Sequence, residues 1–165
     1  MAKSLLRTDK ELAEIYERHL KTVYRVCFAY MKNSADTEDA VSDTFFKMIQ
    51  SAAAFENAEH EKAWLIRTAT NICKNTLKHW WRKNRPLEEL EPLRDKRNIE
   101  IDSTLAAVME LPDKYKTVVY LYYYEQYTGA EISNILHKPQ STVRNHLHEA
   151  RIILKNKLGD EFNES

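Results

Sequence analysis

Glycine and proline are rare in this sequence. Of its 165 residues only two are glycine and four are proline, and these residue types most often interrupt helices. The chain also lacks an apolar run of the roughly 20 residues that a membrane span requires. Its first residues, MAKSLLRTDKELAEI, lead directly into a charged helical pattern without a signal peptide. We therefore expect an ordered, helix-rich protein of the cytoplasm.

The residue clusters that an active site requires are missing as well. The two cysteines, Cys27 and Cys73, are too few and too far apart for a disulfide framework or a C-x-x-C site, and we expect buried, reduced thiols. Of His137, His146 and His148, the last two point to different sides of a helix. No carboxylate or cysteine completes a metal-ligand set, and there is no glycine-rich phosphate loop. We therefore expect no enzyme activity, no metal and no cofactor.

The charges cancel in total but are segregated along the chain. There are 25 basic and 25 acidic residues. Residues 64–85 contain no acid, and residues 138–158 contain only Glu149. Conversely, residues 36–43 carry four acids and no base. Segregated basic stretches are what phosphate binding requires, so neutrality does not exclude a nucleic-acid partner.

Helical periodicity runs through most of the chain. We expect helices at residues 8–31, 36–51, 62–83, 103–111 and 112–124, followed by a pair of short helices. The alternation typical of strands is missing, so the predicted fold class is all-α. The segment RPLEELEPLRDKRN has two prolines and mixed charges without periodicity, which indicates a linker. The prediction is two small helical domains, residues 8–84 and 102–162, joined by a linker at residues 85–101.

The last two helices form a helix-turn-helix pattern. Thr128 and Glu131 have the spacing of a capping box, and Pro139 ends the first helix while suiting the first turn of the next. The outward face of the second helix is polar and consists of Ser141, Thr142, Asn145, His148 and Glu149, with Arg144 on the flank. Such a helix fits a DNA major groove, although the pattern also suits an ordinary antiparallel helix pair.

The helix expected at residues 62–83 carries a basic face. Its members are Arg67, Asn71, Lys74, Lys78 and Arg82. The cations can follow a phosphate backbone and the asparagine can reach base edges, whereas a solvated face would normally mix both signs of charge. Phe55, Trp64, Trp80 and Trp81 lie nearby. Aromatic rings in such a place stack on unpaired bases or fill the core, which we expect for Trp64.

Three stretches occur in an order and at a spacing that one known family shares. They are DTEDAVSDTFFKMI at residues 36–49, WLIRTATN at residues 64–71, and YYYEQYTGAEISNIL followed by PQSTVRNHLHEAR. They resemble, in turn, the polymerase-binding helix, the promoter −10 helix and the C-terminal domain of the extracytoplasmic-function sigma factors of bacterial RNA polymerase, a group of the sigma-70 superfamily. Any one of these motifs is weak, but three in order over nearly the whole chain are strong.

This resemblance implies a role for each charged region. The N-terminal domain of these factors, sigma region 2, grips the β′ clamp helices of RNA polymerase core through an acidic helix, with matching residues Asp36, Glu38, Asp39, Asp43 and Phe46. It also melts the promoter −10 element and captures an unstacked base in a loop, here within residues 55–62. The C-terminal domain, sigma region 4, reads the −35 element and contacts the β flap. The implied partners are polymerase core and promoter DNA, and an anti-sigma factor is a common further one.

A free-standing helix-turn-helix regulator, acting as a dimer, is the alternative that the residues leave open. It accounts for the last two helices and their polar face. It leaves the acidic residues 36–43 and the basic residues 64–85 without a role.

Among the departures from the family pattern near the expected DNA-reading helix, those at His137 and Glu149 matter most. His137 stands where the turn usually has glycine, a position that often needs positive φ. Glu149 stands where a basic residue is usual. A carboxylate facing the groove repels phosphate but accepts a hydrogen bond from a cytosine amino group. Alternatively, Glu149 pairs with Arg144 or Lys155 of the same helix, or stays solvated.

Overall fold

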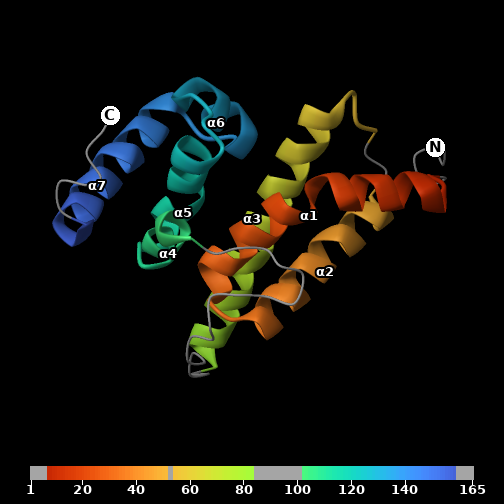
Figure 1. The fold of residues 1–165 in the computed structure, drawn as a ribbon, viewed down its shortest axis with the longest axis horizontal. Helices are drawn as coiled ribbons and strands as arrows, with labels where there is room; N and C mark the ends of the chain where they lie inside the picture. The colour runs from red at the N-terminus through yellow and green to blue at the C-terminus, as the bar shows by residue number, and fades with distance from the viewer. Residues whose placement is uncertain (1–6, 52–53, 84–101, 159–165) are drawn as a thin grey trace. The chain divides into compact units, whose positions relative to one another are not determined.

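A computed structural model describes residues 7–51, 54–83 and 102–158, and every regular element within them is helical. The chain falls into two compact units, which meet in sequence between residues 100 and 101 (Figure 1). The predicted all-α fold with two small helical domains is thus confirmed. The boundaries at residues 8–84 and 102–162 stay predictions, and the predicted linker lies outside the described residues. Among the described helices, none has the length and apolar character needed to cross a membrane.

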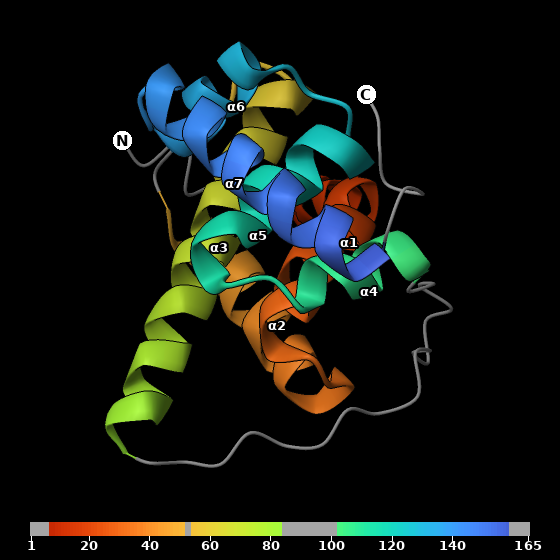
Figure 2. The ribbon, with the colours of Figure 1, turned by 90° about the vertical axis from the view of Figure 1, so that its left-hand side faces the viewer.

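Three long helices form the N-terminal unit (Figure 2). They are α1 (Asp9–Met31), α2 (Ser34–Gln50) and α3 (Ala58–Arg82), and each packs against the other two. All three contribute to one apolar core, with Val23 and Phe28 from α1, Val41 and Met48 from α2, and Leu65 and Ile66 from α3. The shared core fixes the outward faces of α2 and α3 relative to one another.

Asparagine caps determine where α2 and α3 begin. Asn33 Oδ1 accepts from the N–H of Asp36 at 2.8 Å, and Asn57 Oδ1 accepts from the N–H of His60 at 2.8 Å. Because asparagine is among the best N-cap residues, α2 begins two residues earlier than predicted and α3 four residues earlier. The first turn of α3 escapes prediction because it has no apolar periodicity.

The two cysteines meet in the core of the N-terminal unit. Cys27 of α1 and Cys73 of α3 are both free and buried, as predicted. The interaction with the Cys73 thiol, followed by burial away from water, raises the pKa of Cys27 well above its usual value. The Cys27 thiol is therefore protonated in the folded protein, and both cysteines are shielded from water.

Four short segments and one long helix form the C-terminal unit. They are α4 (Ser103–Met109), α5 (Asp113–Val119), the π-helical segment η2 (Tyr120–Tyr124), α6 (Gly129–Leu136) and α7 (Gln140–Leu158). α7 packs on both α5 and α6, and its buried face consists of Val143, Leu147, Ala150 and Leu154. The helix predicted at residues 112–124 therefore has the expected position, but its last turn is widened.

The tyrosine-rich segment η2 is partly buried in the core of the C-terminal unit. Tyr120 is fully buried, its ring stacks on that of Tyr124 with centroids 5.1 Å apart, and its hydroxyl donates to Glu125 Oε2 at 2.6 Å. Tyr122 and Tyr123 are half-buried. Within this run, packing in the core is thus observed at Tyr120.

The turn between α6 and α7 depends on one left-handed residue. The capping box of Thr128 and Glu131 is present at the start of α6. At the other end His137 has a φ of 56° and donates its N–H to the carbonyl of Ser133. The positive φ expected at this position is confirmed. It turns the chain sharply enough for α7 to begin at Gln140.

Candidate functional site

The exposed side of α2 combines acidic and apolar side chains. Asp39 and Asp43 are exposed, and Phe46 and Ile49 expose 58% and 46% of their surface. We call these four residues the acidic-apolar face. Large apolar side chains exposed beside charges of one sign are typical of a surface that another protein covers. Ile49 is an addition to the residues predicted from the sequence.

The remaining predicted acids lie at the margin of this face. Asp36 is half-buried, and its carboxylate accepts from Asn33 Nδ2 at 2.9 Å. Glu38 is half-buried as well. Phe45 points inward, with its ring against that of Tyr16 at a centroid distance of 4.9 Å. A partner that approaches α2 therefore meets Asp39 and Asp43 more directly than Asp36 or Glu38.

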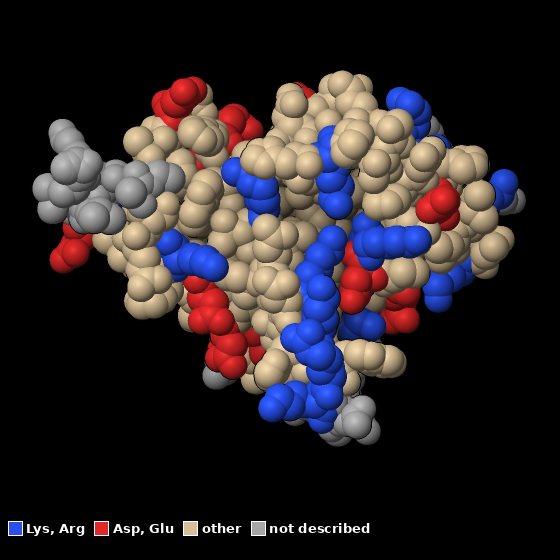
Figure 3. All heavy atoms as spheres, turned by 180° about the vertical axis from the view of Figure 1, so that it is seen from behind, with Lys and Arg blue, Asp and Glu red and all other residues tan. Residues whose placement is uncertain are grey.

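α3 carries the predicted basic face. Its members are the exposed Asn71, Lys78 and Arg82 and the half-buried Arg67 and Lys74. Figure 3 shows Lys and Arg side chains in a column in its lower part, where α3 ends. Burial lowers the pKa of Arg67 from its ordinary value, but a guanidinium stays charged over the accessible pH range. α3 has no acid after Glu61, so this face is positive along its length.

Helical spacing alone would place Leu65, Ala69, Ile72, Thr76 and Trp80 of α3 on one inward stripe, but the structure buries only part of it. Only Leu65 and Ala69 are buried, and the last buried residue of α3 is Cys73. Beyond it, Trp80 is half-buried and Trp81 exposes 82% of its surface. The last two turns of α3 thus lie at the margin of the core, which explains the difference.

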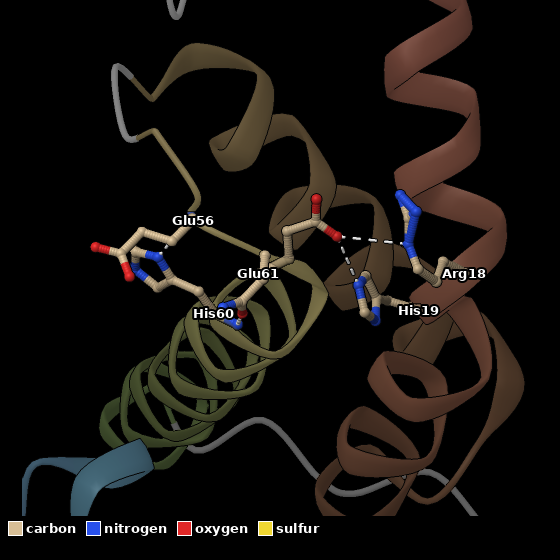
Figure 4. Close-up of polar contacts among 6 residues, drawn as sticks. Arg18, His19, Glu56, His60 and Glu61 are labelled. Atoms are coloured by element: carbon tan, nitrogen blue, oxygen red, sulfur yellow. Dashed lines mark hydrogen bonds and ion pairs between the residues drawn. The ribbon is translucent and has the colours of Figure 1, made fainter.

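The segment that leads into α3 is held by ring contacts. The ring of Phe55 lies edge-on to His60 at 5.5 Å and tilted against Trp64 at 5.8 Å. The guanidinium of Arg7 lies 4.9 Å from the centre of the same ring. His60 Nδ1 in turn accepts from the N–H of Glu56 at 3.1 Å (Figure 4). Residues 54–57 therefore have a defined arrangement beside Trp64.

A hollow of about 440 Å³ lies between the end of α2 and the outer side of α3. It is lined by Lys47, Gln50, Ser51, Trp64, Thr68, Asn71, Ile72 and Asn75. One aromatic ring with amide, hydroxyl and ammonium groups around it is the chemistry that holds a nucleobase. We expected Trp64 to fill the core, but it is only half-buried and also lines this hollow.

α7 presents a polar side opposite its buried face. Ser141, Arg144, Asn145, His148 and Glu149 are exposed, and Thr142 is half-buried. These are the residues predicted to face DNA, and the structure places them together on one helix. Their spacing is that of a recognition helix following a tight turn.

Glu149 has a partner that the sequence pattern did not reveal. Its Oε1 accepts from the hydroxyl of Tyr115 at 2.8 Å. The same tyrosine ring lies edge-on to His146, with centroids 5.4 Å apart. Glu149 is thus tied to α5 from the outward side of α7. This contact was not among the expected pairings with Arg144 or Lys155.

Metal binding has no support in the described ranges. No three His, Cys, Asp or Glu side chains gather there in a way that could hold an ion. The residues with recognisable surface chemistry lie instead on α2, α3 and α7.

Comparisons with known proteins match both units of the chain. Sigma-70 region 2 matches residues 15–85, and Sigma-70, region 4 matches residues 101–154. The ECF RNA polymerase sigma factor SigW of Bacillus subtilis (strain 168) is 25% identical over 96% of this chain and 95% of its own. RNA polymerase sigma factor SigV of the same strain is 29% identical over 87% and 88%.

A solved structure has the same fold. It is the sigma factor RpoE in complex with the anti-sigma factor NepR from Bartonella quintana, with a TM-score of 0.74 and 16% identity over 94% of this chain and 99% of that one. The two family matches, in order and over both helical units, agree with this fold. The chain belongs to the extracytoplasmic-function sigma factors of the sigma-70 family.

Proposed function

We propose that this protein is an alternative sigma factor that binds RNA polymerase core and directs it to a specific set of promoters. The observation that carries the proposal is that separate surfaces of the protein suit different partners. An acidic-apolar face on α2 suits a protein partner, and basic or polar faces on α3 and α7 suit DNA. Members of this family are transcription initiation factors, and we propose no catalytic role for any residue.

The acidic-apolar face of α2 is the proposed contact with the β′ clamp helices. Phe46 and Ile49 would lose their exposed surface on binding, and burial of apolar area is the main driving force of association. Asp39 and Asp43 would add electrostatic steering toward a basic partner, with Asp36 and Glu38 at the margin.

The proposed −10 contacts lie on α3 and beside it. The basic face follows the backbone through Arg67, Lys74, Lys78 and Arg82, and Asn71 reaches base edges. Asn71 also lines the hollow beside Trp64. A base that leaves the duplex stack can enter this hollow and stack on the indole ring. Melting is thereby favoured, because the unpaired state gains contacts that the duplex lacks.

The polar side of α7 is the proposed −35 contact. The six residues predicted to face DNA, Ser141, Thr142, Arg144, Asn145, His148 and Glu149, would enter the major groove. A free-standing regulator would use α7 in the same way. That alternative gives no role to the acidic-apolar face or to the hollow, and the matches to both sigma-70 regions favour the sigma factor.

An anti-sigma factor is a proposed further partner. The structure of CnrH in complex with the cytosolic domain of CnrY shares the fold, with a TM-score of 0.66 and 18% identity. The partner in the RpoE structure is the anti-sigma factor NepR, and the partner in the CnrH structure is the cytosolic domain of CnrY. For the present chain we propose action in the cytoplasm, where polymerase and promoter DNA are found.

Transcription in vitro tests this proposal. Core polymerase is incubated with a pool of genomic promoter fragments, with and without the protein, and the transcripts are sequenced. A set of promoters sharing one −10 and one −35 element should be transcribed only when the protein is present. Tight, specific binding of duplex DNA by the free chain at physiological salt, without any effect on polymerase, would instead identify a free-standing regulator.

A further inference from the structure

A polar cluster ties α1 to the first turn of α3 (Figure 4). His19 of α1 is 4% exposed, and its Nε2 lies 2.9 Å from Oε1 of Glu61. The Nε of Arg18 lies 3.5 Å from the same oxygen. Because an ionised carboxylate can only accept, the hydrogen of His19 lies on Nε2 and is donated to Glu61. One carboxylate oxygen of α3 thus accepts a hydrogen bond from His19 and forms an ion pair with Arg18, both on α1.

The position of Glu61 links this cluster to the loop at residues 54–57, the segment that leads into α3. Glu61 is the fourth residue of α3 and directly follows His60. The ring of His60 accepts from the N–H of Glu56 and lies against Phe55. Phe55 in turn contacts Trp64, which lines the hollow. A displacement of Glu61 from α1 would therefore move the first turn of α3 and, with it, the loop beside the hollow.

The burial of the cluster shows that its geometry is strongly constrained. The side chain of Glu61 is 14% exposed and that of His19 is 5% exposed. A buried charge that loses its hydrogen-bond partner is much more costly than an exposed one, so few arrangements of these helices are tolerated. Charge-assisted hydrogen bonds also have narrow distance and angle requirements. The cluster is thus suited to fixing a position.

We propose that Arg18, His19 and Glu61 are positioning residues for recognition of the −10 element, an inference that rests on the proposed function. Through the adjacent His60 they keep Phe55 against Trp64, so that the indole wall of the hollow has a fixed position for the captured base. They act through the loop and do not touch DNA. Loss of the cluster should therefore alter which −10 sequences are accepted, and leave polymerase binding and −35 reading as they are.

Variants of Glu61 in the complete protein bound to polymerase core test this. Glu61→Ala removes the acceptor, and Glu61→Gln removes the charge but keeps an oxygen for His19. Glu17→Ala is the matched control, because it removes an exposed acid of α1 next to the cluster and outside residues 55–62. Each holoenzyme transcribes a promoter library with a randomised −10 element and a constant −35 element. Base capture is followed by 2-aminopurine fluorescence at each −10 position, and core affinity is titrated separately.

The expected effect is confined to recognition of the −10 element. Glu61→Ala should reduce the preference at the captured position by on the order of tenfold, since small misplacements of a binding group have large effects. It should also weaken the 2-aminopurine signal. Glu61→Gln should be intermediate, and Glu17→Ala should resemble the unaltered protein. Core affinity should be the same for all four.

Other results would overturn the inference. An equal loss of transcription on every −10 sequence, or a loss of core affinity in parallel, would reduce the cluster to a structural role. If circular dichroism shows that Glu61→Ala does not fold, Arg18→Ala is tested in its place. The Arg18 side chain is 40% exposed, so its loss is better tolerated. Arg18→Ala with an unchanged −10 preference would then contradict the proposal. If the unaltered protein shows no −10 preference at all, the proposed function itself has failed.

Discussion

The two helices proposed to face DNA, α3 and α7, arrange their charges differently. α3 has no acid after Glu61, so its outer face attracts phosphate along its whole length. α7 carries Glu149 among the polar residues of its outward side, and a hydroxyl of α5 holds that carboxylate in place. A uniformly basic face adds affinity without regard to sequence. An acid fixed within a polar face reduces that affinity and leaves sequence preference to side chains that reach base edges.

The largest effect should come from a change on α2, which leaves α3 and α7 unaltered. Asp39→Lys with Asp43→Lys reverses the exposed charges of α2 and should weaken binding to polymerase core by on the order of a hundredfold or more, because like charges then meet across the contact. Co-purification and titration with core measure this. Glu14→Lys with Glu17→Lys applies the same charge change to exposed residues of α1 and should bind normally. Undiminished binding by the α2 variant would refute the proposed contact.

Two substitutions on α3 separate base reading from phosphate binding. Asn71→Ala should cost about 1–3 kcal/mol at one −10 position and little elsewhere. Lys78→Ala should weaken binding of all sequences alike and lower the slope of log affinity against log salt by about 1. Holoenzyme binding to a −10 library at several salt concentrations measures both. Identical profiles for the two variants would mean that Asn71 reads no base.

On α7 the corresponding test is Glu149→Arg. Because Tyr115 already occupies one carboxylate oxygen, we expect a uniform gain across −35 sequences and a salt slope that is steeper by about 1–2. Tyr115→Phe keeps the charge but removes the tie, so it should leave the salt slope unchanged. A −35 element library read with both variants provides the measurement. A change confined to one base position would instead assign cytosine reading to Glu149.

The smallest effect concerns the core beneath these faces. The raised pKa of Cys27 means that its thiol stays protonated in the folded protein, whereas an unfolded thiol ionises near pH 8.5. The contribution to stability is therefore complete below about pH 8.5 and declines as the pH rises above that value. Urea denaturation between pH 7 and 10 should show less pH dependence for Cys27→Ala than for the unaltered protein. Equal pH dependence of the two proteins would contradict this origin.

Local features of the fold could be predicted from the sequence, whereas contacts between distant residues could not. The capping box at Thr128 and Glu131 and the basic face of α3 depend on spacings of a few residues, which a sequence displays directly. The tie between His19 and Glu61 joins residues 42 positions apart, and that between Tyr115 and Glu149 spans 34. Such pairs depend on how helices pack, and no spacing rule specifies them.

The candidate surfaces follow the same division. The predicted acidic and basic residues do lie on the outside of α2 and α3, because amphipathic periodicity assigns them there. The exposure of Ile49 and the hollow beside Trp64 escaped prediction. Both depend on where a neighbouring helix ends, which periodicity along a single helix does not reveal.

The left-handed conformation of His137 has a consequence for how this protein can evolve. A residue with a β-carbon is disfavoured there by roughly 1–2 kcal/mol relative to glycine. Glycine also makes the unfolded chain more flexible, and this offsets part of the gain in stability. A single substitution to glycine would thus recover a modest part of this difference. Natural selection keeps proteins above a stability threshold and does not drive them to a maximum. Replacement of His137 by glycine is therefore a stabilising change still open to this protein. It could compensate for a destabilising substitution on the surface of α7 that we propose to read DNA, as promoter preference changes.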